Sequence, residues 1–472
     1  MGMAQEADSL RESIQPMAGV HGTDLGPRHL WGTLEIDAKG QLWLGGIPAQ
    51  VLAERFGTPV MVYDEQLLRD NMRAFHQAFL HTGLQYDISY AAKAFCTVAM
   101  CKLAYDEGLS LDVVSGGELY TAVQAGVPGE KIHFHGNNKT PEEVAFALES
   151  QVGVVIVDNF TELTLLEAMA AARGTTVDVL LRISPGVEAH THEFISTGQQ
   201  DSKFGFDLAS GQARQAFRQV RHAPHLRCIG LHSHIGSQIF DSAGFVTAVE
   251  RLSELYAQGV ILGLPLRVLN VGGGFGIRYT EDDAPVPVER QIVAIAGAVR
   301  RSFDTLNLDL PEVWVEPGRS IVGLAGTTLY RVGTQKVMPG VRNYVAVDGG
   351  MTDNPRLALY GSKYEAVLAN RALDNADGDW TVAGKCCESG DVLIWDAPLP
   401  SPQPGDVMAV FATGAYNYSM ASHYNRNPNP GVVFVRNGKA AVVVERETWA
   451  DVARLDRPLL YDGDFTAGIH RS

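Results

Sequence analysis

One lysine is the first residue of this sequence that could do covalent chemistry. Lys93 stands in the stretch SYAAKAF, among small apolar residues and at the end of a predicted strand. A lysine removed from water loses its charge more readily and then becomes a nucleophile toward carbonyl groups. A lone lysine more commonly extends its amine into solvent, so the role of Lys93 depends on the groups around it.

A glycine triplet and two polar side chains predict an anion site. Gly272–Gly274, in NVGGGFG, follow a predicted strand, and the bare N–H groups of such a loop suit a phosphate, with Gly273 and Gly274 next to it. Ser237, in HSHIGSQ, and Arg319, in EPGRS, follow two other predicted strands and offer further donors. Three loops that agree in this way favour a phosphate ligand.

Glu316 places a carboxylate at the end of another predicted strand, directly before Pro317, Gly318 and Arg319. It either forms a structural ion pair with Arg319 or holds a ring nitrogen in its protonated form. A reactive lysine, a phosphate site and an acid for a pyridine nitrogen together describe pyridoxal 5′-phosphate. We therefore predict this cofactor, with Gly318 among the residues around it.

Two histidine pairs leave a metal site open as an alternative. His232 and His234 share one strand face, as do His133 and His135, and this spacing also occurs in zinc-dependent barrel hydrolases. No cluster of acids stands at matching positions, and a metal would leave the phosphate features without a role. We therefore predict no metal, and expect one histidine to pack flat against the cofactor ring while the others are structural.

The elements that must position these residues are strands that alternate with amphipathic stretches. The predicted strands lie in eight segments: 86–94, 110–116, 131–136, 153–159, 178–186, 228–236, 267–274 and 312–319. Between them stand helical patterns such as GGELYTAVQAG and TPEEVAFALES. Apolar strands in regular alternation with helices predict a parallel sheet, and eight units favour a closed (β/α)8 barrel over an open sheet.

Polar residues at the strand ends support this architecture, because barrel enzymes place their active sites at the carboxyl ends of the strands. Almost every predicted strand ends in a residue that could do chemistry. These residues are Lys93, Ser115, His135, Asp158, Arg182, His234, Gly272–Gly274 and Glu316.

After about residue 325 the helical repeats stop and strand patterns predominate. Asn437-Gly438 between valine-rich arms predicts a tight hairpin, and residues 32–46 predict another that joins the same domain. We expect a flexible tail over 1–27 and a cofactor-binding barrel over 58–325. Residues 28–57 and 326–472 should form a mostly β domain, a Greek-key-like barrel, that completes the active site of a dimer.

The composition excludes several classes of protein. The chain has 472 residues, a net charge of −16 and five cysteines without framework spacing. The negative charge argues against nucleic-acid binding, and the cysteines fit a reducing compartment. Because no stretch approaches the roughly 18 apolar residues of a membrane span, we predict a cytoplasmic protein without membrane or nucleic-acid partners.

From about residue 30 to 460 the sequence resembles the alanine-racemase-like, fold-type III pyridoxal-phosphate decarboxylases, most closely the diaminopimelate decarboxylases. The resemblance rests on long segments in the same order: YAAKAF, SGGEL, HGNNK, VEAHTHEFISTG, SKFG, GLHSHIGSQ, VGGGFG, VEPGRS, VDGGMTDNPRLALYG, CESGD and TGAYNYSMASHYN. One departure is Phe95, where the lysine motif of the family commonly has asparagine. We expect this to affect local packing only.

The resemblance implies roles for individual residues. Lys93 would carry the cofactor covalently, His234 would stack on its ring and Glu316 would face the ring nitrogen. Cys387, in KCCESGD, would be the general acid, whereas Cys386 lies outside the motif and receives no role. Ser237, Gly274, Arg319 and Tyr416 are assigned to the phosphate and its surroundings, and Arg319, Arg356, Tyr360, Glu388 and Tyr416 to the substrate.

The implied activity is decarboxylation of meso-2,6-diaminopimelate to L-lysine and carbon dioxide, the last step of bacterial lysine biosynthesis. The enzyme would be a homodimer in which Cys387 and Glu388 reach the active site of the other subunit. Decarboxylation of another basic amino acid or of a carboxylated polyamine is the alternative within this fold. A metal-dependent hydrolase and a non-catalytic pyridoxal-phosphate carrier are the alternatives from other classes.

Overall fold

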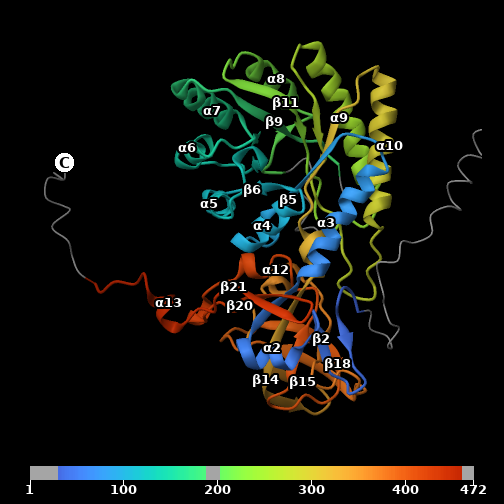
Figure 1. Cartoon of the computed structure of the whole chain (residues 1–472), viewed down its shortest axis with the longest axis vertical. Coiled ribbons are helices and arrows are strands. Elements are labelled where there is room, and N and C mark those ends of the chain that lie inside the picture. Colours follow the sequence, from blue (N-terminus) through green and yellow to red (C-terminus); the bar gives the residue numbers. More distant parts are fainter. Residues whose placement is uncertain (1–29, 188–201, 460–472) are drawn as a thin grey trace, which may run out of the picture.

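Eight parallel strands close into a barrel in the computed structural model, which describes residues 30–187 and 202–459 (Figure 1). Each strand is bonded to the next, and the last, β13, pairs with the first, β5. The strands are β5 (Tyr86–Ala91), β6 (Ser110–Val113), β7 (Ile132–Phe134), β8 (Val154–Val157), β9 (Val177–Ser184), β11 (Leu226–His232), β12 (Val268–Asn270) and β13 (Glu312–Val315). Six lie within the segments predicted as strands, and β9 and β11 begin one and two residues before theirs, so the predicted barrel is confirmed.

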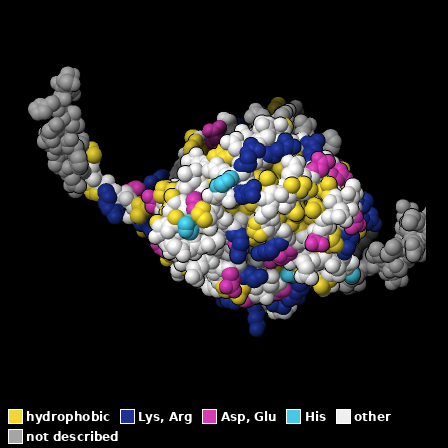
Figure 2. Space-filling view, turned by 90° about the horizontal axis from the view of Figure 1, so that it is seen from above, with side chains coloured by type: hydrophobic (Ala, Val, Ile, Leu, Met, Phe, Trp, Pro, Cys, Tyr) yellow, Lys and Arg dark blue, Asp and Glu magenta, His cyan; other side chains and the backbone are white. Residues whose placement is uncertain are grey.

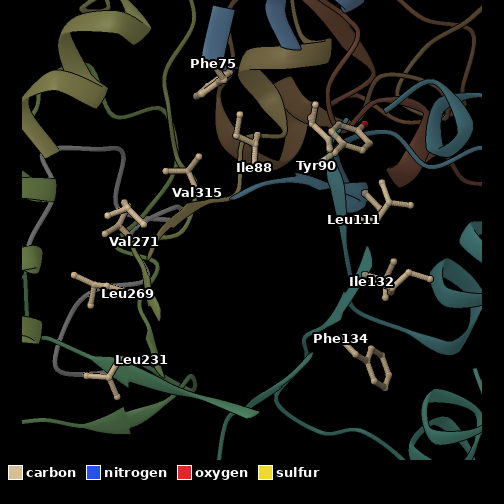
Figure 3. Packing of buried hydrophobic residues seen from close by; sticks show 14 of the residues in the cluster. Phe75, Ile88, Tyr90, Leu111, Ile132, Phe134, Leu231, Leu269, Val271 and Val315 are labelled. Carbon is tan, nitrogen blue, oxygen red and sulfur yellow. The ribbon is translucent and has the colours of Figure 1, made fainter. Parts of the chain in front are cut away.

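Alternation along the barrel strands separates two apolar clusters. Leu269, Val313 and Val315 belong to the large cluster between strands and helices, and Figure 3 shows such side chains around the ring of strands. Val268 and Trp314, their neighbours in sequence, belong to a small separate cluster with Val154, Ile156, Leu180 and Ile229. Because successive side chains of a strand point to opposite faces, this small cluster fills the interior of the barrel.

Helices surround the barrel: α3 (Glu65–Leu80), α4 (Val98–Asp106), α5 (Gly116–Gln124), α6 (Pro141–Glu149), α7 (Phe160–Arg173), α8 (Gln212–Arg221), α9 (Ala243–Ile261) and α10 (Val288–Leu306). Side-chain caps start several of them within six residues of the end of a strand. Ser115, Thr140 and Asn159 each accept a hydrogen bond from the backbone N–H three residues later. These caps fix where each helix begins after the strand that precedes it.

The second domain is built on a nine-stranded sheet whose main path runs β18-β17-β15-β14-β4-β20-β21, with β19 on β14 and β16 on β19. Its members are β4 (Val60–Asp64), β14 (Gly326–Met338), β15 (Arg342–Val347), β16 (Ala366–Leu368), β17 (Gly378–Ala383), β18 (Val392–Leu399), β19 (Val407–Val410), β20 (Gly431–Arg436) and β21 (Lys439–Val444). The long strand β14 divides its apolar side chains between two clusters, with Tyr330 in one and Leu329 in the other.

Short elements complete this part of the chain. β1 (Glu35–Ile36), β2 (Leu42–Leu44) and β3 (Ile47–Pro48) form a small antiparallel sheet, followed by α2 (Ala49–Phe56). The predicted hairpin in 32–46 is therefore present, and Leu42 donates its N–H to Ala369 of the β domain. Asn437 and Gly438 both have positive φ, as the predicted tight turn between β20 and β21 requires.

One strand lies in a sheet that the sequence analysis did not expect. β4 falls within 58–325, which we expected to form the barrel, but it pairs with β14 and β20. All five residues of β4 are buried, as in any strand that is covered on both faces. Such a continuous apolar sequence does not indicate whether the strand joins the barrel or the β-domain sheet. The structure also contains β16 and β17, which the sequence analysis did not identify.

Three further helices matter for the site or the surface: α11 (Arg319–Val322), α12 (Arg356–Tyr360) and α13 (Trp449–Ala453). In Figure 1, α13 extends away from the body of the molecule. Figure 2 shows basic and acidic side chains intermixed over one face, with apolar ones between them. No helix in the described part of the chain is long and apolar enough to cross a membrane.

Candidate active site

A cavity at the carboxyl ends of the barrel strands contains all nine residues predicted to bind the cofactor. It is lined by Ala91, Lys93, Asp112, His234, Ser237, Gly273, Gly274, Glu316, Gly318, Arg319 and Tyr416. Ten of these belong to the barrel strands, the loops after them and α11, whereas Tyr416 comes from the β domain. The backbone N–H of Tyr416 donates to the carbonyl of Ala94, next to Lys93, at 2.8 Å. The cavity is thus completed by both parts of the chain.

The strand register explains why polar groups gather here. Trp314 fills the barrel interior, and Glu316 stands two residues later on the same side of the chain. Leu180 and Arg182 on β9, and Ile156 and Asp158 at the end of β8, repeat the pattern. An apolar layer low in the barrel is therefore followed by a polar layer at its mouth.

Glu316 is held by three neighbours and not by Arg319. Its carboxylate accepts a hydrogen bond from Asn270 at 2.7 Å, and lies 3.1 Å from Nε2 of His232 and 3.1 Å from Nε2 of His135. Burial alone would raise the pKa of Glu316, but the charges and hydrogen bonds of the two histidines hold it well below its ordinary value. Glu316 is therefore an anion that can hold a proton on a ring nitrogen.

His234 presents a neutral ring to the same cavity. The backbone N–H of Gly273 donates to its Nδ1 at 3.2 Å, which places the proton of the ring on Nε2. Burial, together with the charges of Lys93 and Arg182, lowers the pKa of His234 well below its ordinary value. A neutral imidazole suits the predicted packing against a cofactor ring.

The three remaining histidines of the two pairs, His133, His135 and His232, are buried inside the barrel. His133 stacks on Trp314 with 4.5 Å between ring centroids and is bonded to Ser89, which fits the structural role expected for it. His135, His232 and Glu316 place their ligand atoms within 4.8 Å of one another, a grouping that could also hold a metal ion. The sequence analysis argued against a metal because it found no cluster of acids at matching positions. In the structure, Glu316 places one acid beside His135 and His232.

Glycines allow three loops to converge on the cavity. A Cβ on Gly273 would lie 2.0 Å from the carbonyl oxygen of Glu316, and one on Gly274 would lie 2.4 Å from that of Gly236. Gly274 also has a φ of +111°, which other residues rarely adopt. Side chains are therefore excluded where backbone N–H groups must reach an anion.

Arg319 is a buried cation without a carboxylate partner among residues 30–187 and 202–459. It is 5% exposed, donates from Nη2 to Ser237 at 2.9 Å and from Nη1 to the hydroxyl of Tyr279, and its Nε has no hydrogen-bond partner. Its guanidinium lies over the ring of Tyr416, 4.8 Å from the centroid. A buried charge in this state is stabilised when an anion binds.

Arg356 repeats this arrangement from the β domain. It is also 5% exposed, and no acidic group in the described ranges lies within ion-pair distance of it. Its guanidinium lies 5.5 Å from the ring centroids of both Tyr360 and Tyr416. Burial opposes its charge, but the surrounding tyrosines raise its pKa above the ordinary value, so Arg356 remains a cation.

Cys387 and Glu388 lie apart from this cavity. Both are exposed, and neither is among the residues that line it. The backbone of Cys387 is nevertheless fixed, because its N–H donates to Oδ1 of Asn425 at 2.7 Å and its carbonyl accepts from Tyr424. The half-buried Cys386 accepts a weak hydrogen bond from Asn427 through its sulfur, and burial raises its pKa to about 11.

Asp112 is a lining residue that the sequence analysis missed. It lies on β6, burial raises its pKa to about 6, and its carboxylate approaches Nε2 of His135 at 3.6 Å. An acidic residue inside the fully buried segment Ser110–Val113 was the available signal.

Phe95, the departure from the family motif, is fully buried and stacks on Tyr63 at 4.2 Å, as expected for a packing residue. Residues 190–198, part of the family segment VEAHTHEFISTG, lie outside the described residues.

These groups fit pyridoxal phosphate. A phosphate finds bare N–H groups and the unpaired Arg319, a pyridine nitrogen finds an anionic carboxylate, and a carbonyl finds Lys93. The donor set therefore matches each end of the molecule.

Comparisons with known proteins agree with this geometry. A family model described as the pyridoxal binding domain of pyridoxal-dependent decarboxylases matches residues 65–323. Diaminopimelate decarboxylase of Bacillus subtilis is 56% identical over 430 residues, which cover 91% of this chain and 98% of that protein.

Solved structures extend the comparison to three dimensions. Diaminopimelate decarboxylase of M. jannaschii in complex with L-lysine aligns with a TM-score of 0.84 and 34% identity, over 90% of this chain and 98% of that one. The Helicobacter pylori enzyme, also complexed with L-lysine, aligns with a TM-score of 0.79 and 30% identity, over 86% and 98%. This chain belongs to the diaminopimelate decarboxylase family of pyridoxal-dependent decarboxylases.

Proposed function

We propose that this enzyme decarboxylates meso-2,6-diaminopimelate to L-lysine and carbon dioxide, the last step of bacterial lysine biosynthesis. The observation that carries the proposal is the pair of buried cations, Arg319 and Arg356, which have no carboxylate partner in the described parts of the chain. A substrate with a second carboxylate far from the reacting one would supply the missing charge. The relatives bound to L-lysine support a pocket for such a molecule.

Bound pyridoxal phosphate supplies an electron sink for the α-carbon from which carbon dioxide leaves. Lys93 would hold it through its amine, and Glu316 would keep a proton on its ring nitrogen. Ser237, Gly274, Arg319 and Tyr416 would hold the phosphate side, with Gly273 and Gly318 giving the backbone room to approach. The neutral His234 would pack against the ring.

Substrate recognition would fall to residues of both domains. Arg356, with Arg319, would bind the distal carboxylate through forked hydrogen bonds, and Tyr360 and Tyr416 would border the same space. A decarboxylase of lysine or ornithine has no distal carboxylate to bind, so two unpaired arginines would only be a cost to it.

The same proposal includes a homodimer with shared sites. Cys387 would deliver a proton to the α-carbon, and Glu388 would bind the distal ammonium, both in the active site of the partner subunit. Both are exposed and neither lines the cavity of its own subunit, which supports this arrangement. We further propose that residues 58–325, apart from β4, form the cofactor-binding unit, and that 28–57 and 326–472 complete the site together with β4. We also propose that the enzyme is cytoplasmic.

The decisive experiment measures carbon dioxide release from meso-diaminopimelate beside lysine, ornithine and arginine. We expect turnover of meso-diaminopimelate only, because only this substrate brings a second carboxylate to Arg356 and Arg319. Activity confined to the other three amino acids would show that the alternative, a decarboxylase of another basic amino acid, is correct.

A further inference from the structure

Tyr279 lies beside both buried arginines that lack a carboxylate partner in the described ranges, although it belongs to no recognised motif. It follows the glycine triplet in the segment GIRYTEDD and is 7% exposed. Its own position is fixed by the short turn after it, because Oδ2 of Asp283 accepts hydrogen bonds from the backbone N–H groups of Tyr279 at 2.8 Å and Thr280 at 3.0 Å.

The side chain of Tyr279 contacts each guanidinium. Its hydroxyl accepts a hydrogen bond from Nη1 of Arg319. The guanidinium of Arg319 lies 5.7 Å from the centroid of its ring, and that of Arg356 lies 5.9 Å from the same centroid. Tyr364 packs edge-on against the ring at 5.6 Å, so the ring plane is held as well.

Two buried like charges beside one ring repel each other, and within the described chain no acidic side chain offsets them. Arg319 donates to the hydroxyl of Ser237 and Arg356 to that of Ser362, both neutral groups. The further compensation is aromatic, from the rings of Tyr279 and Tyr416 and the phenolic oxygen of Tyr279. The guanidiniums still have free hydrogen-bond donors, since Nε of each arginine lacks a partner. Tyr279 thus stabilises both cations without occupying the place of an anion.

We infer that Tyr279 is a positioning residue for substrate specificity. It orients Arg319 and Arg356 so that both can bind the carboxylate that the substrate keeps, at the end of the molecule away from the reacting carbon. The inference rests on the proposed function, because it needs a substrate with two carboxylates. L-Lysine is a direct probe of it, since decarboxylation removes the reacting carboxylate and leaves the other on the product.

The test is Tyr279→Phe, which removes the hydroxyl and keeps the ring. We expect the KM for meso-diaminopimelate and the inhibition constant of L-lysine to rise together by about tenfold, because a hydrogen bond to a charged group is lost. The kcat should change much less, and the cofactor absorbance should stay. Inhibition by pentane-1,5-diamine, which has no carboxylate, should be the same as in the wild type.

Tyr330→Phe is the matched control. Tyr330 is a fully buried tyrosine of the same apolar cluster, but its hydroxyl donates to Asp353 and not to an arginine. It should leave all three constants unchanged. A fall in kcat without a change in KM for Tyr279→Phe, or equal weakening of both inhibitors, would overturn the inference. Failure of the wild type to turn over meso-diaminopimelate would instead refute the proposed function itself.

Discussion

At the scale of single residues, charge in this site is set by neighbours as much as by burial. Glu316 is as buried as Asp112, yet the pKa of Glu316 is lowered and that of Asp112 is raised to about 6. The difference arises because Glu316 receives two histidines and an amide, whereas Oδ1 of Asp112 has no hydrogen-bond partner. Glu316 is thus kept as an anion, whereas Asp112 changes its charge at about pH 6.

The two adjacent cysteines allow a prediction at the same scale. Cys387→Ala should lower kcat strongly, because it removes the proposed proton donor, while the cofactor absorbance stays unchanged. Cys386→Ala, a loss of the same thiol one residue earlier, should have almost no effect, since the half-buried sulfur of Cys386 accepts only a weak hydrogen bond from Asn427 and does not line the cavity. Steady-state kinetics of the two variants decide this, and full activity of Cys387→Ala would exclude the role as general acid.

At the scale of elements, one carboxylate joins two turns of the β domain. Oδ1 of Asp391 accepts from the N–H of Met351 and Oδ2 accepts from that of Cys386, each at 2.6 Å. Glycine is needed beside it, because a Cβ on Gly384 would lie 2.3 Å from the Asp391 carboxylate. The turn that carries Cys387 and Glu388 is therefore held rigidly although its side chains are exposed.

The neighbouring Asp353 gives this region a pH dependence. It is buried, accepts hydrogen bonds from Tyr330 and the N–H of Gly350, and burial raises its pKa to about 7, from about 4 in an unfolded chain. A raised pKa means that the folded state binds the proton more tightly, so this contribution to stability is complete below about pH 4 and is lost as the pH rises to about 7.

Asp353→Asn should remove that contribution, because the amide cannot ionise. The melting temperature of the variant relative to the wild type should therefore increase as the pH rises from 5 to 7.5. Thermal unfolding followed by circular dichroism at several pH values measures this difference. If the difference in melting temperature between variant and wild type stays constant from pH 5 to 7.5, the pKa of Asp353 is not raised, however large that difference is.

At the scale of the whole molecule, the active site depends on contacts between parts of the chain that are distant in sequence. Tyr416 joins the cavity from the β domain, and the hydroxyl of Tyr63 on β4 donates to the carbonyl of Gly414 at 2.8 Å, which anchors the segment before it. β4 itself links the β-domain sheet to α3 on the barrel. The orientation of the two parts is therefore part of the catalytic geometry.

A shared active site predicts complementation between inactive subunits. Lys93→Ala should abolish covalent cofactor binding and activity, and Cys387→Ala should be strongly impaired. If both residues meet across the dimer interface, random mixing of the two variants should restore about a quarter of the wild-type activity, since half of the dimers then contain one intact site.

The mixture must be unfolded or exchanged before the assay, and differently tagged subunits verify that mixed dimers form. Recovered activity would come from the one site that has neither substitution. Mixed dimers without any gain in activity would show that Cys387 acts in its own subunit or not at all.

Much of the fold could be predicted from the sequence because its signals are local. Each signal acts over a few residues: the alternation of apolar residues along a strand, a helix cap such as Thr140, and the Asn437-Gly438 turn. The barrel strands and the hairpin that these signals predict are present in the structure. β16 and β17 were missed, since each is short or mixed in burial. Asp112 and Tyr279 were missed because neither belongs to a motif, and their importance comes from what packs against them.

By itself, the sequence determined the barrel, the polar residues at its mouth and the family, since strand periodicity and ordered motifs are properties of the linear chain. Only the tertiary structure decided that Glu316 pairs with histidines and not with Arg319, and that β4 enters the β-domain sheet. It also decided that the ring of Tyr279 lies beside both Arg319 and Arg356. The reason is that charge state, strand pairing and cation–π contact depend on distances between residues far apart in the chain, which no local pattern specifies.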